Sequence, residues 1–451
     1  MNEVNYLKNT LYNLFDKIQY EEVRYNITPY KLESLKYNIC NYLKNILNVD
    51  FIMYEMNEKT YIGVGQALEF KITSNNFTIE HKESNLKINE EFKSLSNLLQ
   101  EIYSIFESNK ISAFGNINFN LAKYLYLSNY CNKNDELLHF FVPSIKVEIS
   151  EGEMLVQFLE SNPFSELSDI YEEIEMIHVP LKSNPERILL NQQSDIYKKN
   201  VGNAISDIKK GKYSKVIISR KINISESINM IKSYFLGLKF NTPARSYLYN
   251  VNEKELFGFS PETIVQVDNY NKVLTFPLAG TRKNEEALKK ELLTDIKEVG
   301  EHAVSVNLAL KELGDVCIPN SIIVEEFMDI YERGSVQHLG SKVSGILDNK
   351  NYWDALLSLY PAVTASGIPK KESIEAIEKY EDTPRNLYSG GIFIIDNEIG
   401  FDVALILRTV FQDKEETYLR AGAGIVEKSN PDREMEETRE KLKSVIEALS
   451  L

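Results

Sequence analysis

The sequence predicts an α+β protein in which antiparallel sheets are covered on the outside by helices. Strand-like segments often follow one another directly, as in the hairpin pattern of Thr263–Val267 and Val273–Phe276 around a polar turn. Other segments show helical periodicity, as Ser194–Lys210 does. Strands and helices do not alternate strictly, which argues against a doubly wound parallel sheet.

Length and composition narrow the class of protein. The 451 residues are 43% hydrophobic and 11% aromatic, which favours a large folded core in one or two domains over disorder. Lys and Arg total 51 against 66 Asp and Glu, so the net charge is -15. Nucleic acids and anionic membranes bind basic surfaces, so neither is expected as the main partner. A small anionic ligand in a local basic pocket remains compatible.

The cysteines and the hydropathy pattern predict a cytoplasmic protein. Cys40, Cys131 and Cys317 are far apart and odd in number, which is typical of a reducing compartment. The first 25 residues lack the apolar stretch of a signal peptide. The longest uncharged run, Ala355–Pro369, is too short to span a bilayer.

Residues 1–185 combine helical stretches with short strands. The strands are expected at Thr60–Leu68, Phe70–Thr73 and Phe77–His81, with a turn at 74–76 before the last of them. Polar loops are expected at 132–136 and 181–186.

From about residue 190 the pattern is clearer. A helix at 194–210 is followed by a strand at Lys215–Ile224, and one long helix is expected over Glu286–Leu313. Further strands are expected at 391–396, 403–411 and 416–420, and a last helix begins at Pro431.

Several common catalytic motifs are missing. Gly422-Ala423-Gly424 resembles the start of a dinucleotide fingerprint, but Glu427 stands in place of the third glycine. The sequence has no GxxxxGK[ST], HExxH or GxSxG motif, and its five histidines show no zinc spacing. A nucleotide-binding, zinc or serine hydrolase reading is therefore disfavoured.

Two pairs of acidic residues suggest a metal site. Glu298 and Glu301 are three residues apart and share one helix face, and so do Glu434 and Glu437, with Lys441 one turn later. Two such helices facing each other could hold Mg²⁺, which prefers oxygen ligands. The alternative is a charged helix face that only contacts water.

The Gly-rich segment Ala421–Gly424 is interpreted as a turn between a strand and a helix. Its free backbone N–H groups could bind a carboxylate. The alternative is a tight connection that needs glycine for steric reasons.

Isolated polar residues interrupt apolar strands at Lys215, Glu262 and Arg408. A buried lysine can lose its proton and act as a base, and a buried glutamate can keep its proton and act as an acid. The alternative for each is a residue at a strand end that reaches solvent.

Taken together, the motifs resemble one family from residue 194 onward. They are YSKVIISR (213–220), FGFSPE (257–262), FPLAGTR (276–282), DIKEVGEH (295–302), ERGSVQHLGS (332–341), PAVTASGIPK (361–370), PRNLYSGG (384–391), ALILRTVF (404–411) and AGAGIVEKSNPDREMEETREKL (421–442). In this order they resemble the chorismate-utilising enzymes, which include anthranilate synthase large subunits, aminodeoxychorismate synthases, isochorismate synthases and salicylate synthases.

Within this family the sequence is most similar to the salicylate synthases of siderophore pathways. These enzymes convert chorismate to isochorismate and then release pyruvate, leaving salicylate. Lys215 occupies the position of the lysine base of water-using members, and ammonia-using members usually carry another polar residue there. Ala279 stands where aminodeoxychorismate synthases typically place a nucleophilic lysine.

The resemblance implies a site for Mg²⁺ and chorismate on two packed, mainly antiparallel sheets. Glu301 and Glu437 would bind Mg²⁺ directly, and Glu298 and Glu434 would assist through waters. Lys215 would be the base that activates water at C2, Glu262 the acid that protonates the departing C4 hydroxyl, and His338 a hydrogen-bonding residue near the ring. The substrate would contact Gly280, Thr281, Thr364, Tyr388, Arg408, Gly422, Gly424 and Lys441.

The resemblance also sets expectations for partners and alternatives. The N-terminal region (1–185) is expected to be interwoven with the catalytic region (186–451) in one compact unit, as a monomer or homodimer. Because of Lys215, no glutaminase subunit is expected. The nearest alternative is an isochorismate synthase that does not release pyruvate, and a more distant one is a non-catalytic binding protein of the same fold.

Overall fold

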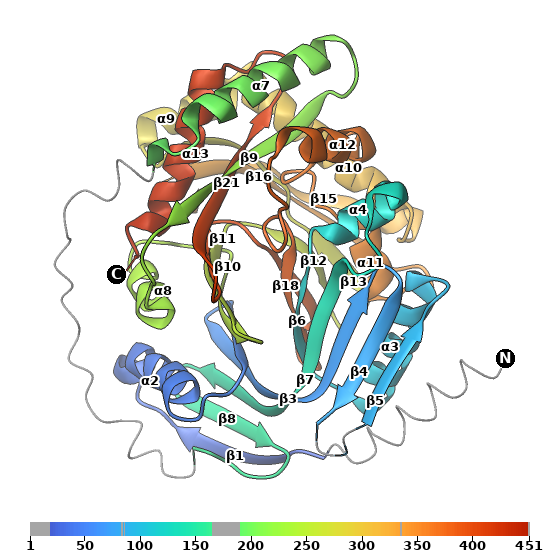
Figure 1. The fold of residues 1–451 in the computed structure, drawn as a ribbon, viewed down its shortest axis with the longest axis vertical. Helices are drawn as coiled ribbons and strands as arrows, with labels where there is room; N and C mark the ends of the chain where they lie inside the picture. The colour runs from blue at the N-terminus through green and yellow to red at the C-terminus, as the bar shows by residue number, and fades with distance from the viewer. Residues whose placement is uncertain (1–18, 83, 85, 165–189, 334–335, 450–451) are drawn as a thin grey trace.

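The fold is α+β, as predicted. The computed structural model describes residues 19–82, 84, 86–164, 190–333 and 336–449. In this part of the chain, 21 strands hydrogen bond into one continuous sheet in which every pairing is antiparallel. Helices cover its outer faces (Figure 1). The predicted loop at 181–186 lies outside the described residues.

Most elements before residue 165 lie in the lower part of the molecule in Figure 1, and α4 (Asn120–Tyr126) reaches up to α12 (Lys370–Tyr380). The strands are β1 (Glu21–Asn26), β2 (Phe51–Met56), β3 (Lys59–Thr73), β4 (Asn76–His81), β5 (Leu86–Glu91), β6 (Ala113–Ile117), β7 (Glu136–Ser150) and β8 (Glu153–Phe158). The helices are α2 (Leu32–Asn45), α3 (Leu95–Asn109) and α4 (Asn120–Tyr126), and short 3₁₀ turns occupy Pro29–Lys31 and Ser128–Tyr130.

The elements after residue 190 supply the remaining strands and helices. The strands are β9 (Lys215–Ile224), β10 (Arg245–Val251), β11 (Lys254–Ser260), β12 (Thr263–Val267), β13 (Lys272–Thr275), β14 (Leu278–Lys283), β15 (Ile323–Arg333), β16 (Val336–Ile346), β17 (Gly367–Ile368), β18 (Gly391–Asp396), β19 (Gly400–Leu405), β20 (Thr409–Gln412) and β21 (Thr417–Ile425). The helices are α7 (Ser194–Lys209), α8 (Met230–Gly237), α9 (Glu286–Thr294), α10 (Ile296–Gly314), α11 (Tyr352–Leu359), α12 (Lys370–Tyr380) and α13 (Pro431–Ile446), with a 3₁₀ turn at Pro319–Ser321.

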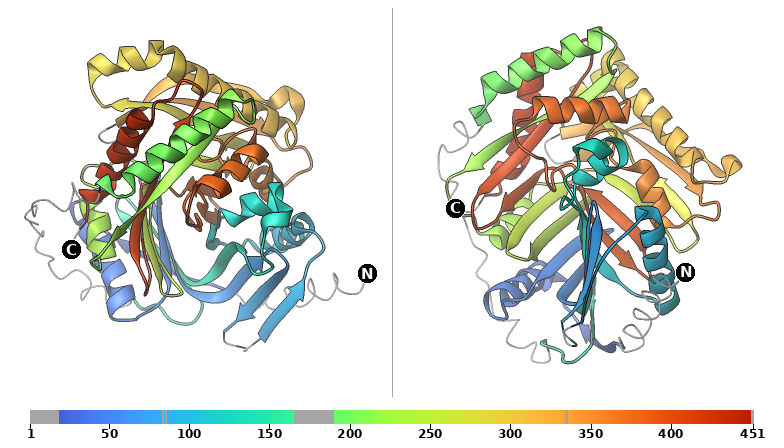
Figure 2. Two further views of the ribbon diagram at one scale, coloured as in Figure 1. Left: turned by 45° about the horizontal axis from the view of Figure 1, so that its top comes forward. Right: turned by 45° about the vertical axis from the view of Figure 1, so that its right-hand side comes forward.

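The two longest strands of the N-terminal region, β3 and β7, belong to both halves of the sheet. They pair with each other from Thr60↔Ile149 to Thr73↔Glu136, with an irregularity between Gln66 and Leu68. On one side the order runs β1-β8-β7-β3-β2-β10-β11-β20-β21-β9-β17. On the other it runs β5-β4-β3-β7-β6-β18-β19-β12-β13-β16, and β14 and β15 also pair with β16. Figure 2 shows the two halves as separate layers.

The hydrophobic side chains of single strands are shared between different cores. On β2, Phe51 and Met53 pack in a cluster with helices α2 and α8, whereas Ile52 and Tyr54 pack in a central cluster with residues of β6, β10 and β18. A third cluster joins the second half of the sheet to α3, α11 and α12. Because successive side chains point to opposite faces of a strand, strands buried on both faces connect these cores.

Strands from the two ends of the chain lie side by side. β2 pairs with β10 from Phe51↔Asn250 to Glu55↔Ser246, and β6 pairs with β18 from Ala113↔Ile395 to Ile117↔Gly391. These ladders join residues before 165 to residues after 190 within the same hydrogen-bonded sheet.

Most of the predicted elements are present, but three boundaries were wrong. The single helix predicted over Glu286–Leu313 is two helices, because Asp295 has an extended backbone and its side chain accepts hydrogen bonds from the N–H groups of Lys297 and Glu298. The predicted strand at 403–411 is interrupted at residues 406–408, where Arg408 has a φ of 49°. The strands predicted at 60–68 and 70–73 form one continuous strand, β3.

No helix of the described residues is long and apolar enough to cross a membrane.

Candidate active site

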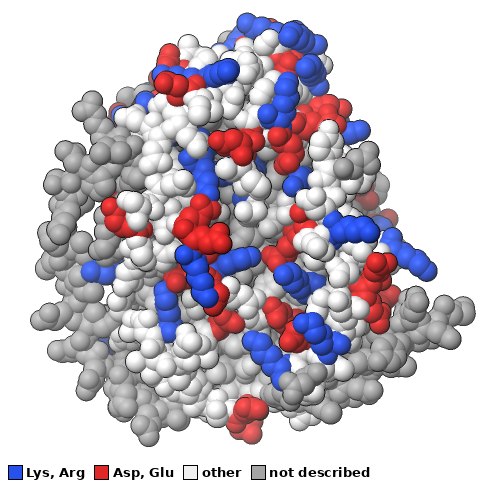
Figure 3. All heavy atoms as spheres, in the orientation of Figure 1, with Lys and Arg blue, Asp and Glu red and all other residues white. Residues whose placement is uncertain are grey.

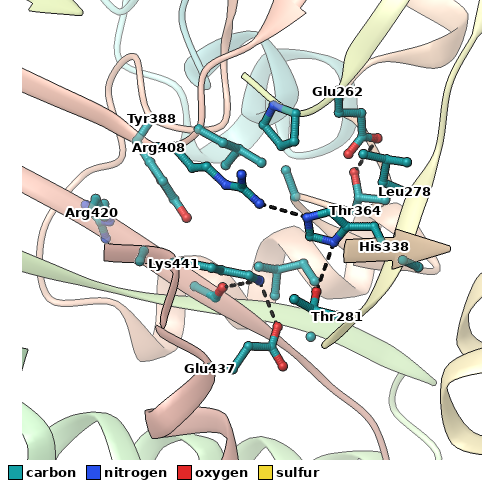
Figure 4. A pocket seen from close by; sticks show the side chains of 18 of the residues that line it. Glu262, Leu278, Thr281, His338, Thr364, Tyr388, Arg408, Arg420, Glu437 and Lys441 are labelled. Atoms are coloured by element: carbon teal, nitrogen blue, oxygen red, sulfur yellow. Dashed lines mark hydrogen bonds and ion pairs between the residues drawn. The ribbon is translucent and has the colours of Figure 1, made fainter. Parts of the chain in front are cut away.

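A cavity lies where β9, β14, β16 and β21 meet α10 and α13. All the site residues predicted from the sequence line it except Glu298 and Glu434. The lining includes Lys215, Glu262, Gly280, Thr281, Glu301, His338, Thr364, Tyr388, Arg408, Gly422, Gly424, Glu437 and Lys441. Side chains that are far apart in the sequence, such as Glu262 and Lys441, therefore line one cavity (Figure 4).

The predicted base and acid are both buried in this cavity. Lys215 is the first residue of β9, is 3% exposed, and its Nζ lies 2.8 Å from Oε1 of Glu301. Glu262 follows β11, is 4% exposed, and accepts a hydrogen bond of 2.7 Å from the hydroxyl of Thr364. Burial raises the pKa of Glu262 to about 8, so this carboxyl keeps its proton at neutral pH.

A second group of residues in the cavity can bind an anion. Arg408 is buried and donates to Nε2 of His338 at 2.8 Å and to the backbone oxygen of Arg333 at 3.3 Å. In the described part of the chain, no carboxylate forms an ion pair with Arg408. Tyr388 is 2% exposed, and its hydroxyl points toward this group in Figure 4. A buried guanidinium without a counter-ion favours a negatively charged ligand.

The structure corrects the interpretation of the Gly-rich segment. Gly422 and Gly424 lie inside β21, paired with Ser219 and Ile217 of β9, and do not form a turn between a strand and a helix. Strand β21 continues to Ile425 because β9 offers it a partner along its whole length. A Cβ atom on Gly424 would lie 2.7 Å from Oε1 of Glu301, so glycine allows that carboxylate to approach the strand.

The four predicted metal ligands come from two helices, α10 and α13, and each is paired with a cation. Arg282 lies 3.0 Å from Glu298, and Lys441 lies 2.8 Å from Glu437. Lys297 links the two helices, with its Nζ 3.4 Å from Glu434 and 3.9 Å from Glu298. In this arrangement, no three His, Cys, Asp or Glu side chains of the described residues converge closely enough to hold a metal ion.

The chemistry of these side chains nevertheless fits a hard divalent cation. Glu434 is fully buried, and its Oε2 has no hydrogen-bond partner. Burial, and then the charge of Glu437, raise the pKa of Glu434 to about 7. A buried carboxylate oxygen without a partner, beside further carboxylates, could accept a hydrogen bond from a water bound to Mg²⁺.

A buried ionic network in the wall of the cavity, which Arg420 lines, was not predicted from the sequence. Glu381 is fully enclosed and accepts hydrogen bonds from Arg385 at 2.6 Å and from Arg420 at 2.6 Å. Both guanidinium groups lie within 6 Å of the ring centre of Tyr388, at 5.7 and 5.8 Å. Arg385 lies within the motif PRNLYSGG and Arg420 directly precedes AGAG, but no local pattern marks Glu381. The two guanidinium groups of this network therefore lie near the ring of Tyr388.

Comparison with known sequences finds one matching family. The sequence pattern of the chorismate binding enzyme family matches residues 50–447. A salicylate synthase of Mycolicibacterium paratuberculosis is 42% identical over 256 residues, which are 55% of this chain and 57% of that protein. An anthranilate synthase component 1 of Saccharolobus solfataricus is 36% identical over 269 residues, which are 58% of this chain and 63% of that protein. The match thus spans a little over half the length of these relatives.

Solved structures share the fold at lower sequence identity. The menaquinone-specific isochorismate synthase of Escherichia coli matches with a TM-score of 0.70 at 16% identity, covering 98% of this chain and 100% of that one. Anthranilate synthase component I of Streptococcus pneumoniae matches with a TM-score of 0.69 at 22% identity, covering 86% and 92%. At these identities the likeness concerns the fold.

Proposed function

The chain belongs to the chorismate-binding enzyme family, and on this premise we propose that it is a salicylate synthase. It would convert chorismate to isochorismate, and isochorismate to salicylate and pyruvate. The observation that carries this proposal is the cavity itself, in which a buried lysine and a buried, protonated carboxyl lie together with an arginine that lacks a counter-ion. The similarity to a salicylate synthase over 256 residues supports the choice within the family.

The first step needs a base and an acid at the two ends of an allylic displacement. Lys215 accepts a proton from water as the water oxygen bonds to C2 of chorismate. The ring double bonds shift, the C4–O bond breaks, and Glu262 donates its proton to the departing hydroxyl, which leaves as water. One water is added and one is released, so the product is an isomer of the substrate. The raised pKa of Glu262 suits this role because the carboxyl is protonated at neutral pH.

The second step forms salicylate. A hydrogen moves from C2 to the methylene carbon of the enolpyruvyl group as the bond between C3 and the ether oxygen breaks, which gives pyruvate and an aromatic ring. This rearrangement mainly requires that the substrate be held in a folded conformation. We assign Arg408, Tyr388 and Lys441 to one carboxylate of the substrate, and the rearrangement needs no residue as a base.

We also propose that Mg²⁺ is the cofactor. Glu301 and Glu437 would bind it directly, with Glu298 and Glu434 behind them. When bound, Mg²⁺ neutralises and orients the ring carboxylate of the substrate. Both Glu301 and Glu437 line the cavity, and Figure 4 shows Glu437 away from Glu262 and Thr364.

Water is favoured over ammonia as the nucleophile. Lys215 occupies the position of the base in water-using relatives, and it lies in the cavity. Ala279 also lines the cavity, where a lysine nucleophile would stand in aminodeoxychorismate synthases. The chain therefore has the lysine that would activate water and lacks the lysine that would act as a nucleophile.

One incubation tests the proposal. Purified protein is incubated with chorismate and Mg²⁺, with and without ammonium, and the products are separated by chromatography. Salicylate and pyruvate in equal amounts support a salicylate synthase. Accumulation of isochorismate without pyruvate selects the alternative of an isochorismate synthase, an aminated ring selects an ammonia-using enzyme, and unchanged chorismate contradicts catalysis.

A further inference from the structure

His338 lies between two parts of the cavity wall and contacts both. Its Nε2 is 2.8 Å from Nη2 of Arg408, and its Nδ1 is 3.1 Å from the hydroxyl of Thr281 and 3.3 Å from the backbone oxygen of Gly280. The ring is 5% exposed (Figure 4). Both ring nitrogens therefore have partners within the protein.

The partner of Nε2 determines where the ring carries its hydrogen. A guanidinium has only donors, so Nε2 must offer a lone pair to Arg408 and cannot carry a hydrogen. The hydrogen of a neutral ring is then on Nδ1, where the backbone oxygen of Gly280 can only accept. If both ring nitrogens carried a hydrogen, the Nε2–H group of His338 would face an N–H group of Arg408. Burial, and then the charge of Arg408, also lower the pKa of His338 well below its ordinary value.

Arg408 is held by its backbone as well as by its side chain. Its φ is 49°, in the left-handed region that residues other than glycine rarely adopt. The N–H group of Phe259 donates to its backbone oxygen at 3.2 Å, and the backbone oxygen of Arg333 accepts from its Nη1 at 3.3 Å. His338 is the other acceptor of this guanidinium among the described residues. Several independent contacts therefore fix the direction of one charged group.

We infer that His338 is a positioning residue, whose neutral ring accepts a hydrogen bond from Arg408 and so aims the guanidinium at the carboxylate of the substrate. It does not carry a proton in the reaction, because its one lone pair is used by Arg408 and its one hydrogen faces Gly280 and Thr281. The part of this inference that concerns the carboxylate rests on the proposed function. The hydrogen position and the contact with Arg408 do not.

Two substitutions of His338 distinguish the contact made by Nε2 from the contacts made by Nδ1. In His338→Gln, the side-chain oxygen can reach the place of Nε2 and accept from Arg408. In His338→Asn, the shorter amide can reach only the place of Nδ1, so it can contact Gly280 and Thr281 but leaves Arg408 without this partner. Neither side chain can transfer a proton at neutral pH, so the pair differs in positioning alone.

The expected result is a divergence in KM for chorismate. Loss of a hydrogen bond to a charged group should raise KM about tenfold or more in His338→Asn, whereas His338→Gln should raise it less than about threefold. His81→Asn, in a histidine at the end of β4 that does not line the cavity, is the matched control. Equal loss of kcat in both His338 variants, with KM of the wild type, would overturn the inference and identify His338 as a proton carrier.

A double-mutant cycle tests whether His338 acts through Arg408. In an Arg408→Ala background, His338→Asn should change KM by less than about twofold, because the group that it positions is already gone. A full tenfold effect in that background would show that His338 contacts the substrate directly and would contradict the positioning role.

The hydrogen position can be read without substrate. In protein labelled with ¹⁵N at histidine, one imidazole at pH 7 should have a protonated Nδ1 and an unprotonated Nε2, and its signals should vanish in His338→Gln. In Arg408→Ala this preference should weaken. A hydrogen on Nε2 of His338 in the wild type would refute the inference even if the enzyme makes salicylate. Conversely, an enzyme that does not use chorismate, with the expected ¹⁵N pattern, would refute only the proposed function.

Discussion

Nζ of Lys215 lies 2.8 Å from Oε1 of Glu301, so the proposed base forms an ion pair with a proposed Mg²⁺ ligand. Both side chains are largely buried, at 4% and 11% exposure. An ammonium that is paired with a carboxylate cannot accept a proton. The same carboxylate oxygen would be drawn to Mg²⁺, so binding of the ion and release of the lysine are expected to occur together.

Lys215→Ala should abolish the addition of water to chorismate while the fold remains intact. Removal of a general base typically reduces the rate by about 10²–10⁴-fold. Formation of isochorismate and salicylate is measured by chromatography, and folding by circular dichroism. The control is Lys221→Ala on the same strand, in a lysine that pairs with Glu416 and does not line the cavity. Substantial remaining turnover in Lys215→Ala would rule out its role as the base.

Glu437→Gln should raise the Mg²⁺ concentration needed for half-maximal activity by at least about tenfold, because an amide oxygen is a weaker ligand than a carboxylate. Mg²⁺ binding measured by calorimetry should weaken in parallel. Glu436→Gln, one residue earlier on α13 and paired with Arg439, should leave the metal dependence as in the wild type. An unaltered metal dependence in Glu437→Gln would remove Glu437 from the metal site.

The pH profile should show a basic limb that belongs to Glu262. Because this carboxyl must be protonated to act as the acid and its pKa is about 8, kcat/KM should fall about tenfold per pH unit above pH 8. The hydroxyl of Thr364 stabilises the ionised form, so Thr364→Val should move this limb to higher pH, whereas Thr364→Ser should keep it in place. If the basic limb of the pH profile shifted equally in Thr364→Val and Thr364→Ser, the hydroxyl of residue 364 would not determine its position.

Glu381→Gln should destabilise the protein by about 3–5 kcal/mol, because it leaves the buried guanidinium groups of Arg385 and Arg420 without their counter-charge. Burial alone would raise the pKa of Glu381, but its arginine partners outweigh burial and lower this pKa. The stabilisation is therefore present above the ordinary pKa and is lost as the pH falls. Urea unfolding at pH 7 and at pH 4 measures both effects. Glu375→Gln, on the exposed face of α12, the helix that ends just before Glu381, should change the stability little.

The sequence predicted elements whose signals are local and missed features that depend on distant contacts. Strand β9 and the hairpin of β12 and β13 followed from apolar alternation and a polar turn. The break at Asp295 was missed because hydrophobic periodicity continues across it, although an aspartate is a good N-cap. Gly422 and Gly424 were placed in a turn because the pairing of β21 with β9 cannot be read from either segment alone.

The difference between local signals and distant contacts also explains which residues of the cavity and its surroundings were predicted. Lys215, Glu262 and Arg408 were identified as polar interruptions in apolar strands, and the motif order grouped them with the other cavity residues. Glu381 carries no such signal, because it lies in an ordinary charged stretch after a helix and becomes buried only through contact with β9 and β21. Its partner Arg385 could have been noticed within the quoted motif, since an arginine beside a predicted ligand tyrosine often has a structural role.

β2 and β6, the neighbours of β3 and β7 in the sheet, also pair with strands after residue 190, and this has a consequence for fragments of the chain. A fragment that starts near residue 190 would retain every side chain of the cavity but would lose β2 beside β10 and β6 beside β18. The unpaired N–H and C=O groups of β10 and β18 would then be exposed at strand edges, and such edges pair with other chains. The proposed catalytic residues thus depend on a scaffold that contributes none of them, and removing that scaffold should yield aggregates rather than a smaller soluble protein.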